Sequence, residues 1–193
     1  GARCAALLGG KKEGKIHTHA GVIKTQVSGG QVRVQLTCPK DIKLGIPLKI
    51  NNRLIKVNFV NTGVPHLVVF VQGIERIDVK KIGRSIRNHQ KFSPAGVNVN
   101  FVELRGKNLI QIRTYERGVE DETLACGTGS AASAVIFSLK HGIENSVKVK
   151  TQSGETLKVF FEKNNDKFRN LWLEGSAKEV FQGEYLRTNS GGK

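Results

Sequence analysis

The feature that most constrains the fold of this chain is a predicted helix that is apolar on every side. Small and apolar residues fill positions 131–139, and the first charge after Cys126 is Lys140. A helix with no polar face is buried, so the rest of the chain must pack around it. Residues 127–130 are Gly, Thr and Ser and suit its first turn, and Gly142 suits its carboxyl-terminal end.

Cys126 precedes this helix and has the setting of a reactive thiol. It lies at the positive end of the helix dipole, which lowers the pKa of a thiol and favours the thiolate. The amides of Gly127 and Thr128 in the same turn can hold an anion such as a carboxylate. Glu116 and Arg117 stand a short distance upstream, and charges of both signs near a thiol suit an amino-acid substrate. The simpler alternative is a cysteine that serves as a small buried hydrophobe.

Three sequence motifs, in a fixed order, connect the chain with a known family. NTGVPH occupies residues 61–66, GVNVNF residues 96–101, and YERG…ETLACGTGSAA residues 115–132. Together they resemble diaminopimelate epimerase, and the resemblance extends over essentially the whole chain. It implies an α+β fold of two similar domains, each a curled, mostly antiparallel sheet around a central buried helix. Residues 1–45, with 178–189 returning to them, would be the rear part of an incomplete first domain, and residues 46–177 the second domain.

The resemblance implies a cofactor-independent epimerase that interconverts LL- and meso-diaminopimelate, in the biosynthesis of lysine and peptidoglycan precursors. The expected chemistry uses two cysteines, one on each face of the α-carbon, and one thiolate removes the proton while the other thiol returns one. Cys126 matches one of this pair. His66 and Glu116 match the groups that set the protonation of the thiols. Glu116 and Arg117 would also bind the amino and carboxylate groups of the substrate.

The resemblance also implies further substrate contacts. The amides of Gly127 and Thr128 would hold the negative charge that develops on the substrate carboxylate. Asn98 matches a family residue that contacts substrate and would anchor the distal end. One position departs from the pattern, because Val64 stands where many members have an asparagine that holds the substrate. That contact is not transferred to this chain.

The first residues resemble the end of another family motif. The chain contains no methionine, and residues 1–4 match the last four letters of CGNGARC. The first cysteine of that motif is the second catalytic thiol of the family, and it would lie before Gly1. We therefore expect the chain as given to be inactive by itself. Cys4, the other cysteine of the motif, is expected to be structural.

Alternation and turn residues predict the remaining elements. A Gly-rich turn at residues 28–30 predicts a hairpin, and residues 77–89 have the spacing of a helix with a basic face. Residues 38–47, which begin at Cys38, are expected to be an irregular linker between domains. The tail from residue 188 is expected to be disordered. The expected strands span residues 14–21, 22–27, 31–36, 54–59, 67–71, 96–104, 111–115, 146–151, 156–162 and 171–174.

Composition argues against several classes of function. The net charge is +15 and the pI is about 10.0, which suits nucleic-acid binding. The basic residues are spread between apolar positions, however, and no aromatic RNA-binding motif occurs, so a solvated Lys-rich surface is favoured. No apolar run is long enough to span a membrane. His17 and His19 share a strand face without acidic or cysteine companions at ligand spacing, so no metal is expected.

The three cysteines have unrelated spacings, which indicates neither a disulfide framework nor a zinc site and fits a reducing cytoplasm. The resemblance adds a small-molecule substrate as the partner and a homodimer, in which Phe181 holds an aromatic position tied to the dimer contact. Two alternatives stay open. One is another cofactor-independent isomerase of the superfamily, such as a proline or hydroxyproline racemase or a phenazine-pathway isomerase. The other is a non-catalytic basic binding protein, against which intact Cys126 and Glu116 argue.

Overall fold

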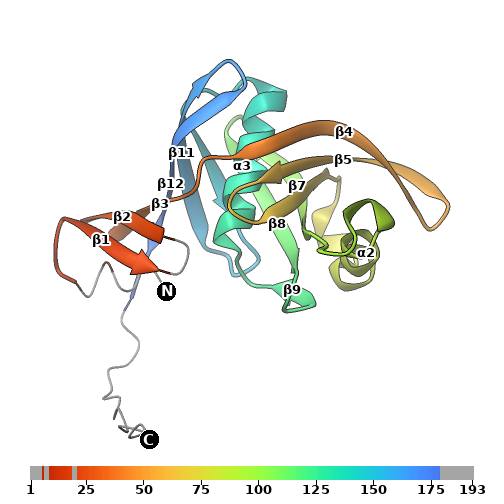
Figure 1. Ribbon diagram of the computed structural model, residues 1–193, viewed down its shortest axis with the longest axis horizontal. Coiled ribbons are helices and arrows are strands. Elements are labelled where there is room, and N and C mark those ends of the chain that lie inside the picture. The colour runs from red at the N-terminus through yellow and green to blue at the C-terminus, as the bar shows by residue number, and fades with distance from the viewer. Residues whose placement is uncertain (1–5, 7–8, 19–20, 179–193) are drawn as a thin grey trace, which may run out of the picture.

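Helix α3 (Gly127–His141) lies at the centre of a sheet that curls around it (Figure 1). The structure is a computed structural model, and it describes residue 6 and residues 9–18 and 21–178. The other helical elements in this part of the chain are η1 (Ile74–Arg76), α2 (Val79–Arg87) and η2 (Gln90–Phe92). The strands are β1 (Glu13–Thr18), β2 (Gly21–Ser28), β3 (Gln31–Gln35), β4 (Lys40–Ile50), β5 (Arg53–Asn61), β6 (Pro65–Phe70), β7 (Asn98–Gly106), β8 (Leu109–Glu116), β9 (Asp121–Thr123), β10 (Ser146–Lys150), β11 (Thr156–Asn164) and β12 (Lys167–Ser176).

The strand order is β1-β2-β3-β12-β11-β10-β8-β7-β6-β5-β4, and β9 pairs with β8 at the side. Neighbours in this order are antiparallel except β6 with β7 and β8 with β10. Each parallel pair is joined by a connection that contains a helix, α2 in one case and α3 in the other, as parallel pairing requires. The predicted α+β fold with a curled, mostly antiparallel sheet around a buried helix is confirmed.

Both predicted ends of α3 are confirmed. Cys126 is the N-cap, and its Sγ accepts a hydrogen bond from the Gly129 amide at 3.4 Å. Gly142 ends the helix in the left-handed region, at φ 67°, where glycine carries no steric penalty. Every residue from Gly129 to Ser138 is buried. The helix is therefore covered on all sides, as its composition predicts.

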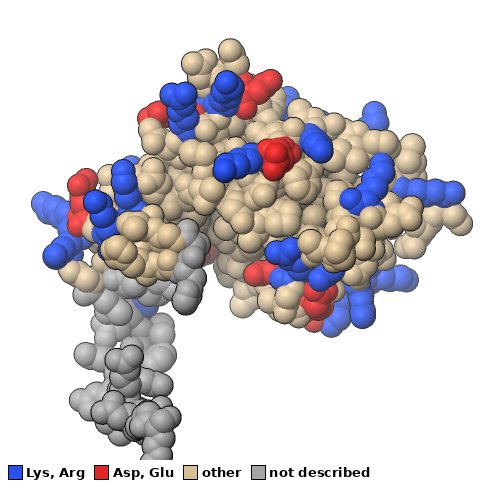
Figure 2. All heavy atoms as spheres, viewed as in Figure 1, with Lys and Arg blue, Asp and Glu red and all other residues tan. Residues whose placement is uncertain are grey.

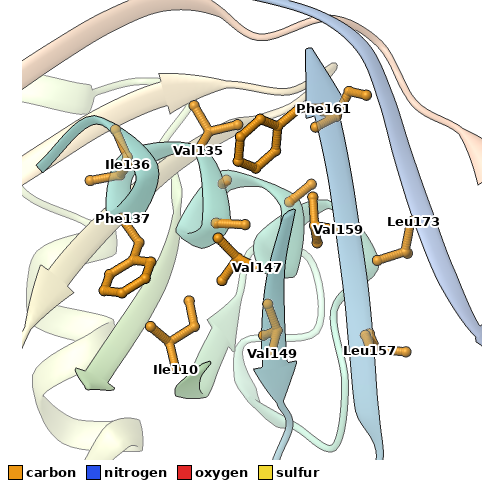
Figure 3. Packing of buried hydrophobic residues seen from close by; sticks show 14 of the residues in the cluster. Ile110, Val135, Ile136, Phe137, Val147, Val149, Leu157, Val159, Phe161 and Leu173 are labelled. Atoms are coloured by element: carbon orange, nitrogen blue, oxygen red, sulfur yellow. The ribbon is translucent and has the colours of Figure 1, made fainter. Parts of the chain in front are cut away.

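The larger hydrophobic core surrounds α3 (Figure 3). Ile136 and Phe137 of the helix and Val147 and Val159 of the facing strands are all buried. Burial of each such side chain contributes about 1.5–3 kcal/mol to stability. The strands around α3 are consequently held by contacts to one helix, which places the amino-terminal end of that helix at a defined point among their ends.

Helix α2 covers a second core. Asp78 caps it, because its Oδ1 accepts a hydrogen bond from the Lys81 amide at 3.0 Å. The buried residues of α2 are Val79, Gly83 and Ile86, which lie on one helix face at the spacing of i, i+4 and i+7. They pack with fully buried side chains of β7 and β8. The predicted helix is confirmed, and its ends lie two residues inside the predicted range.

The predicted strands are confirmed with small shifts in their ends, and β9 is an addition. The expectation of an irregular linker at residues 38–47 is wrong, because most of it belongs to β4, which pairs with β5. Two register shifts near Lys43 and positive φ angles at Asp41 and Gly45 absorb the turn-forming residues without ending the strand. The irregular connection is confined to residues 36–39. The predicted division at residue 45 falls within β4, and the two-domain arrangement stays a prediction.

Basic side chains are dispersed over the face seen in Figure 2, with acidic side chains among them. Ion pairs of the molecule include Arg87 with Glu120 at 2.9 Å and Arg113 with Glu122 at 2.7 Å. The predictions for Cys4, His19, Phe181, the returning segment beyond residue 178 and the tail concern residues outside the described part of the chain.

Candidate active site

Three strands meet at the amino-terminal end of α3. Strand β6 supplies His66, β7 supplies Asn98 and Asn100, and the end of β8 supplies Glu116. The parallel pairing of β6 with β7 sets His66 opposite Asn98, and the antiparallel pairing of β7 with β8 sets Asn100 opposite Thr114. Side chains that are distant in the sequence are thus brought to Cys126 by strand register.

The Cys126 thiol is almost buried, with 7% of the residue exposed. Its Sγ lies 3.6 Å from the Thr128 hydroxyl and 3.4 Å from the Gly129 amide nitrogen. Burial raises the pKa of this thiol, and the charge of Glu116 raises it further, while the bonds from Thr128 and Gly129 lower it. The expectation that the helix dipole leaves a depressed thiol pKa is therefore wrong, because desolvation of the charged form is the largest effect.

His66 is fully buried in the strand, not exposed in a turn. Its Nε2 lies 3.1 Å from Thr128 Oγ1 and its Nδ1 lies 3.1 Å from Asn100 Nδ2. Burial lowers the pKa of His66 to about 3, and the positive charge of Arg117 adds to the effect. The imidazole is consequently neutral near pH 7.

Asn100 belongs to the site although it was not a predicted site residue. It is fully buried, its Nδ2 donates to the Leu67 carbonyl at 2.9 Å, and its Oδ1 accepts from the Thr114 hydroxyl at 3.0 Å. A signal was present in the sequence, because Asn98 and Asn100 alternate on a strand and project from the same face. Only the register of β6 against β7 shows that Asn100 faces the ring of His66.

Asn98 and Arg117 hold the turn that follows β8. Asn98 Oδ1 accepts a hydrogen bond from the Arg117 amide at 2.8 Å, and its Nδ2 lies 3.5 Å from the Pro65 carbonyl. The Arg117 guanidinium donates to the carbonyls of Ala95 at 3.2 Å and Gly96 at 3.4 Å. Asn98 thus has a structural function here, and the second N–H of its amide has no hydrogen-bond partner among the described residues.

Glu116 ends β8 half-buried, and its charge is felt at the Cys126 thiol. The turn after it is stabilised by Glu120, whose carboxylate accepts hydrogen bonds from the Gly118 amide at 3.0 Å and the Tyr115 hydroxyl at 3.2 Å. The Gly118 amide and Arg87 keep the pKa of Glu120 below its usual value, so this carboxylate stays charged. The segment with Glu116 and Arg117 is therefore held in place before any ligand binds.

The turn with Val64 also contacts the helix. Thr62 donates from its hydroxyl to the Thr128 carbonyl at 3.2 Å, and its amide donates to the Val64 carbonyl at 3.2 Å. Asn61 Oδ1 accepts from the Gly63 amide at 3.0 Å, so its side chain caps the turn. The turn therefore positions the first residues of α3.

Within residues 9–18 and 21–178, no group of three or more His, Cys, Asp or Glu side chains is arranged to hold a metal ion. In the same part of the chain, neither helix has the length and apolar character needed to cross a membrane.

The fold resembles that of solved amino-acid racemases and epimerases. A hydroxyproline epimerase from Agrobacterium vitis matches with a TM-score of 0.72 at 15% identity, over 91% of this chain and 61% of that one. A probable proline racemase from Agrobacterium radiobacter K84 matches with a TM-score of 0.70 at 16% identity, over 91% and 63% of the two chains. At these identities the likeness shows a shared fold.

Sequence comparison identifies the family. The sequence model of diaminopimelate epimerase matches residues 58–178. A diaminopimelate epimerase from Aquifex aeolicus is 43% identical over 193 aligned positions, which cover 95% of this chain and 67% of the relative. The chain belongs to the diaminopimelate epimerase family, whose members are isomerases. It spans about two thirds of the length of this relative.

Proposed function

We propose that the protein interconverts LL- and meso-diaminopimelate by proton transfer at the α-carbon, with Cys126 as one of two acid–base groups. The observation that supports this most strongly is the position of Cys126 Sγ at the amino-terminal end of a buried helix. There it lies near the Glu116 charge and the hydrogen-bonded pair of His66 and Thr128. Membership of the diaminopimelate epimerase family supplies the substrate class.

The proposed step needs neither oxidation nor reduction. A thiolate on one face of the substrate takes the α-proton, so the C–H bond breaks as an S–H bond forms. The electron pair left on the α-carbon is delocalised into the carboxylate. A thiol on the opposite face then returns a proton and becomes the thiolate. Because its pKa is raised, Cys126 rests as the thiol and begins as the proton donor. In the reverse reaction it acts as the base.

The first turn of α3 stabilises the developing charge. The amides of Gly127 and Thr128 belong to the helix positions whose N–H groups have no intrahelical partner. They are suited to hold the substrate carboxylate as its charge increases. Arg117 and Glu116 would bind the carboxylate and the amino group, and the remaining N–H of Asn98 would reach the distal end of the substrate.

The second base must lie outside the part of the chain that the structure describes. Free cysteines there are the buried Cys126 and the exposed Cys38. An exposed cysteine gives no desolvated site for substrate. The family motif that residues 1–4 resemble places the second thiol before Gly1, so we propose that the 193-residue chain by itself turns over no diaminopimelate and that a chain carrying that cysteine does.

Deuterium exchange at the α-carbon of LL-diaminopimelate in heavy water, followed by NMR, tests the proposal on the natural full-length protein. We expect exchange with inversion in the wild type, and its loss in Cys126→Ala. Cys126→Ser is the sharper variant, because serine preserves the helix cap while its hydroxyl is a far weaker acid–base group. Cys38→Ala is the matched control and should retain activity. Full exchange in Cys126→Ser would contradict the assignment of Cys126.

Proline and 4-hydroxyproline belong in the same assay, because the fold also resembles solved proteins named for those substrates. Exchange with them and none with diaminopimelate would favour that alternative. A homodimer, a place in lysine and peptidoglycan precursor biosynthesis and a cytoplasmic location accompany the proposal as predictions. Sedimentation of the full-length protein tests the first of them.

A further inference from the structure

A series of hydrogen bonds links Asn100 to His66, Thr128 and Cys126. The donor and the acceptor of each bond can be assigned by starting at Asn100. The orientation of the Asn100 side-chain amide is determined by the Leu67 carbonyl, 2.9 Å away. A carbonyl oxygen can only accept a hydrogen bond, so the NH₂ group must face it. The other end of the amide, Oδ1, then accepts from the Thr114 hydroxyl at 3.0 Å. The Thr114 hydroxyl can donate or accept and is compatible with this orientation, which the Leu67 carbonyl determines.

This orientation decides which nitrogen of His66 carries the proton. The second N–H of the Asn100 amide faces His66 Nδ1 at 3.1 Å and can only donate. Nδ1 must therefore be the unprotonated nitrogen, and in the neutral ring the proton lies on Nε2. Nε2–H in turn faces Thr128 Oγ1 at 3.1 Å and donates to it.

The direction continues to the sulfur. Because Thr128 Oγ1 accepts from His66, its own hydroxyl proton is left to donate elsewhere. Cys126 Sγ lies 3.6 Å away, within the range for a hydrogen bond to sulfur. The steric surroundings hold this arrangement in place, since a Cβ atom at Gly129 would lie 2.4 Å from Asn100 Oδ1 and 3.2 Å from Cys126 Sγ. The backbone of α3 at Gly129 thus lies close to both Asn100 and Cys126, the first and last residues of this series of hydrogen bonds.

We propose that Asn100 is a positioning residue that sets His66 in the Nε2–H form, so that Thr128 donates its hydroxyl proton to the sulfur of Cys126 and stabilises the thiolate. The bonds run from Asn100 to His66, to Thr128 and to Cys126. His66 orients the threonine and takes up no proton itself. The role of the thiolate in turnover rests on the proposed function, whereas the direction of the bonds does not.

Two charged groups act on this chain of bonds without reversing it. Arg117 disfavours a second proton on His66, which preserves the neutral ring. The Glu116 carboxylate disfavours the thiolate of Cys126. Cys126 acts as the base in the reverse reaction and must then be a thiolate. A hydrogen-bond donor near the sulfur stabilises that thiolate against the charge of Glu116.

The tautomer is measured directly by long-range proton–nitrogen NMR on protein labelled with ¹⁵N-histidine, with His66 assigned through its backbone. We expect a proton on Nε2 and none on Nδ1 at pH 7. A proton on Nδ1 in the wild type would overturn the proposal. Asn100→Asp replaces the donor by an acceptor and should move a proton onto Nδ1, and an unchanged spectrum would also contradict the proposal.

Asn58→Asp is the matched control for the strand. Asn58 is buried on β5, and its Nδ2 donates to the Val68 carbonyl of β6 at 3.1 Å, but it makes no contact with His66. Asn58→Asp and Asn100→Asp therefore both lose a hydrogen bond to a backbone carbonyl of β6. We expect the His66 spectrum of Asn58→Asp to match that of the wild type.

The consequence for the thiol is measured by the rate at which iodoacetamide alkylates Cys126, followed on its own peptide by mass spectrometry. Thr128→Val should slow alkylation at pH 8 about tenfold, which corresponds to about one unit of thiol pKa. Thr128→Ser restores the donor and should recover the rate. The double variant Asn100→Asp/Thr128→Val should be alkylated no more slowly than the slower of the two single variants. Both substitutions interrupt the same series of hydrogen bonds, so their effects should not add. Unchanged alkylation in Thr128→Val would refute the donation to sulfur. Neither readout uses substrate, so both stand if turnover is absent.

Discussion

At the scale of single residues, burial decides the protonation of the groups around Cys126. It raises the pKa of the thiol and lowers the pKa of His66, so both groups are neutral at rest. A neutral thiol and a neutral imidazole oppose neither charge of an amino-acid ligand, and the charges of the site are those of Glu116 and Arg117. The polar contacts that surround these two side chains then determine which of them changes its protonation, and Thr128 directs that change to the sulfur.

The buried His66 predicts a pH dependence of stability. Its pKa is about 3 in the folded chain and about 6.5 when unfolded. The unfolded state therefore binds the extra proton first, and stability is complete above pH 6.5 and is lost as the pH falls. We expect the free energy of unfolding to drop by about 2 kcal/mol between pH 7 and pH 5 from this group, given about 1.4 kcal/mol per pH unit.

Urea unfolding at pH 7 and pH 5 measures this change. The matched variant His66→Gln has no titrating ring and should lose much less stability over the same interval. Carboxylates with lowered pKa, such as Glu103 and Glu120, titrate below this window and leave it undisturbed. Equal losses in wild type and variant would show that His66 is not the group responsible.

Ser133 predicts a stabilising substitution. Its hydroxyl is buried inside α3 and has no hydrogen-bond partner among the described residues. Ser133→Ala removes an unsatisfied polar group and improves helix propensity, so we expect a gain of about 1 kcal/mol in the free energy of unfolding. Ser130→Ala is the comparison, because the Ser130 hydroxyl donates to the Cys126 carbonyl at 2.9 Å and its loss should destabilise. A destabilised Ser133→Ala would show that the hydroxyl has a partner.

At the scale of elements, the two helices do different things. Helix α3 organises the sheet and presents its amino-terminal end to the site, and the residue that caps it, Cys126, carries the thiol proposed to act in catalysis. Helix α2 covers the other face of β7 and β8 and supports the segment that bears Glu116. Arg87 of α2 contacts Glu120 in the turn after β8. The position of α2 thus bears on the site through this turn.

At Gly83, helix α2 lies so close to β8 that a larger side chain has no room. A Cβ atom there would lie 2.5 Å from Cβ of Tyr115 and 2.8 Å from its Cγ, and Tyr115 is fully buried. We expect Gly83→Ala to cost about 1–3 kcal/mol of stability through overpacking, although alanine favours a helix by about 1 kcal/mol. Lys81→Ala, on the exposed face of the same helix, should change stability by less than about 0.5 kcal/mol. Thermal or urea unfolding distinguishes the two, and a stabilised Gly83→Ala would contradict this packing.

At the scale of the whole molecule, the net charge is +15, and basic side chains are dispersed over the face seen in Figure 2. Basic side chains on β3, α2 and β8 pair with acidic ones, as in Arg33 with Glu174, Lys80 with Asp121 and Arg113 with Glu122. The large apolar side chains exposed in the described part of the chain are aliphatic, which provides no platform for stacking bases. We therefore expect any binding of nucleic acid by this surface to depend on charge alone.

This arrangement predicts weak binding to nucleic acid that depends only on salt. In a filter-binding assay with a mixed-sequence duplex, we expect retention at 50 mM salt to be lost by 200 mM, as for contacts to phosphates alone. Unrelated sequences should behave alike. Binding that persists at 200 mM salt, or that prefers one sequence, would support the alternative of a basic binding protein.

Much of the site could be predicted from individual residues. Cys126 before an apolar helix, and His66, Asn98 and Glu116 within recognisable motifs, all lie around the start of α3. The raised pKa of the thiol and the part played by Asn100 could not be predicted. The first depends on how many groups surround the sulfur, and the second depends on which residue of β6 pairs with β7. Both are properties of packing between distant segments.

Local features of this protein follow from short stretches of its sequence. An apolar run with a capping residue and a terminal glycine defines α3, because helix burial and helix ends depend on neighbouring residues. Tertiary structure alone decided that residues 40–50 form a strand, since pairing with β5 outweighs their turn-forming composition. It also decided the direction of the bonds from Asn100 to Cys126, because hydrogen bonds between strands and a helix exist only after the sheet has closed around that helix.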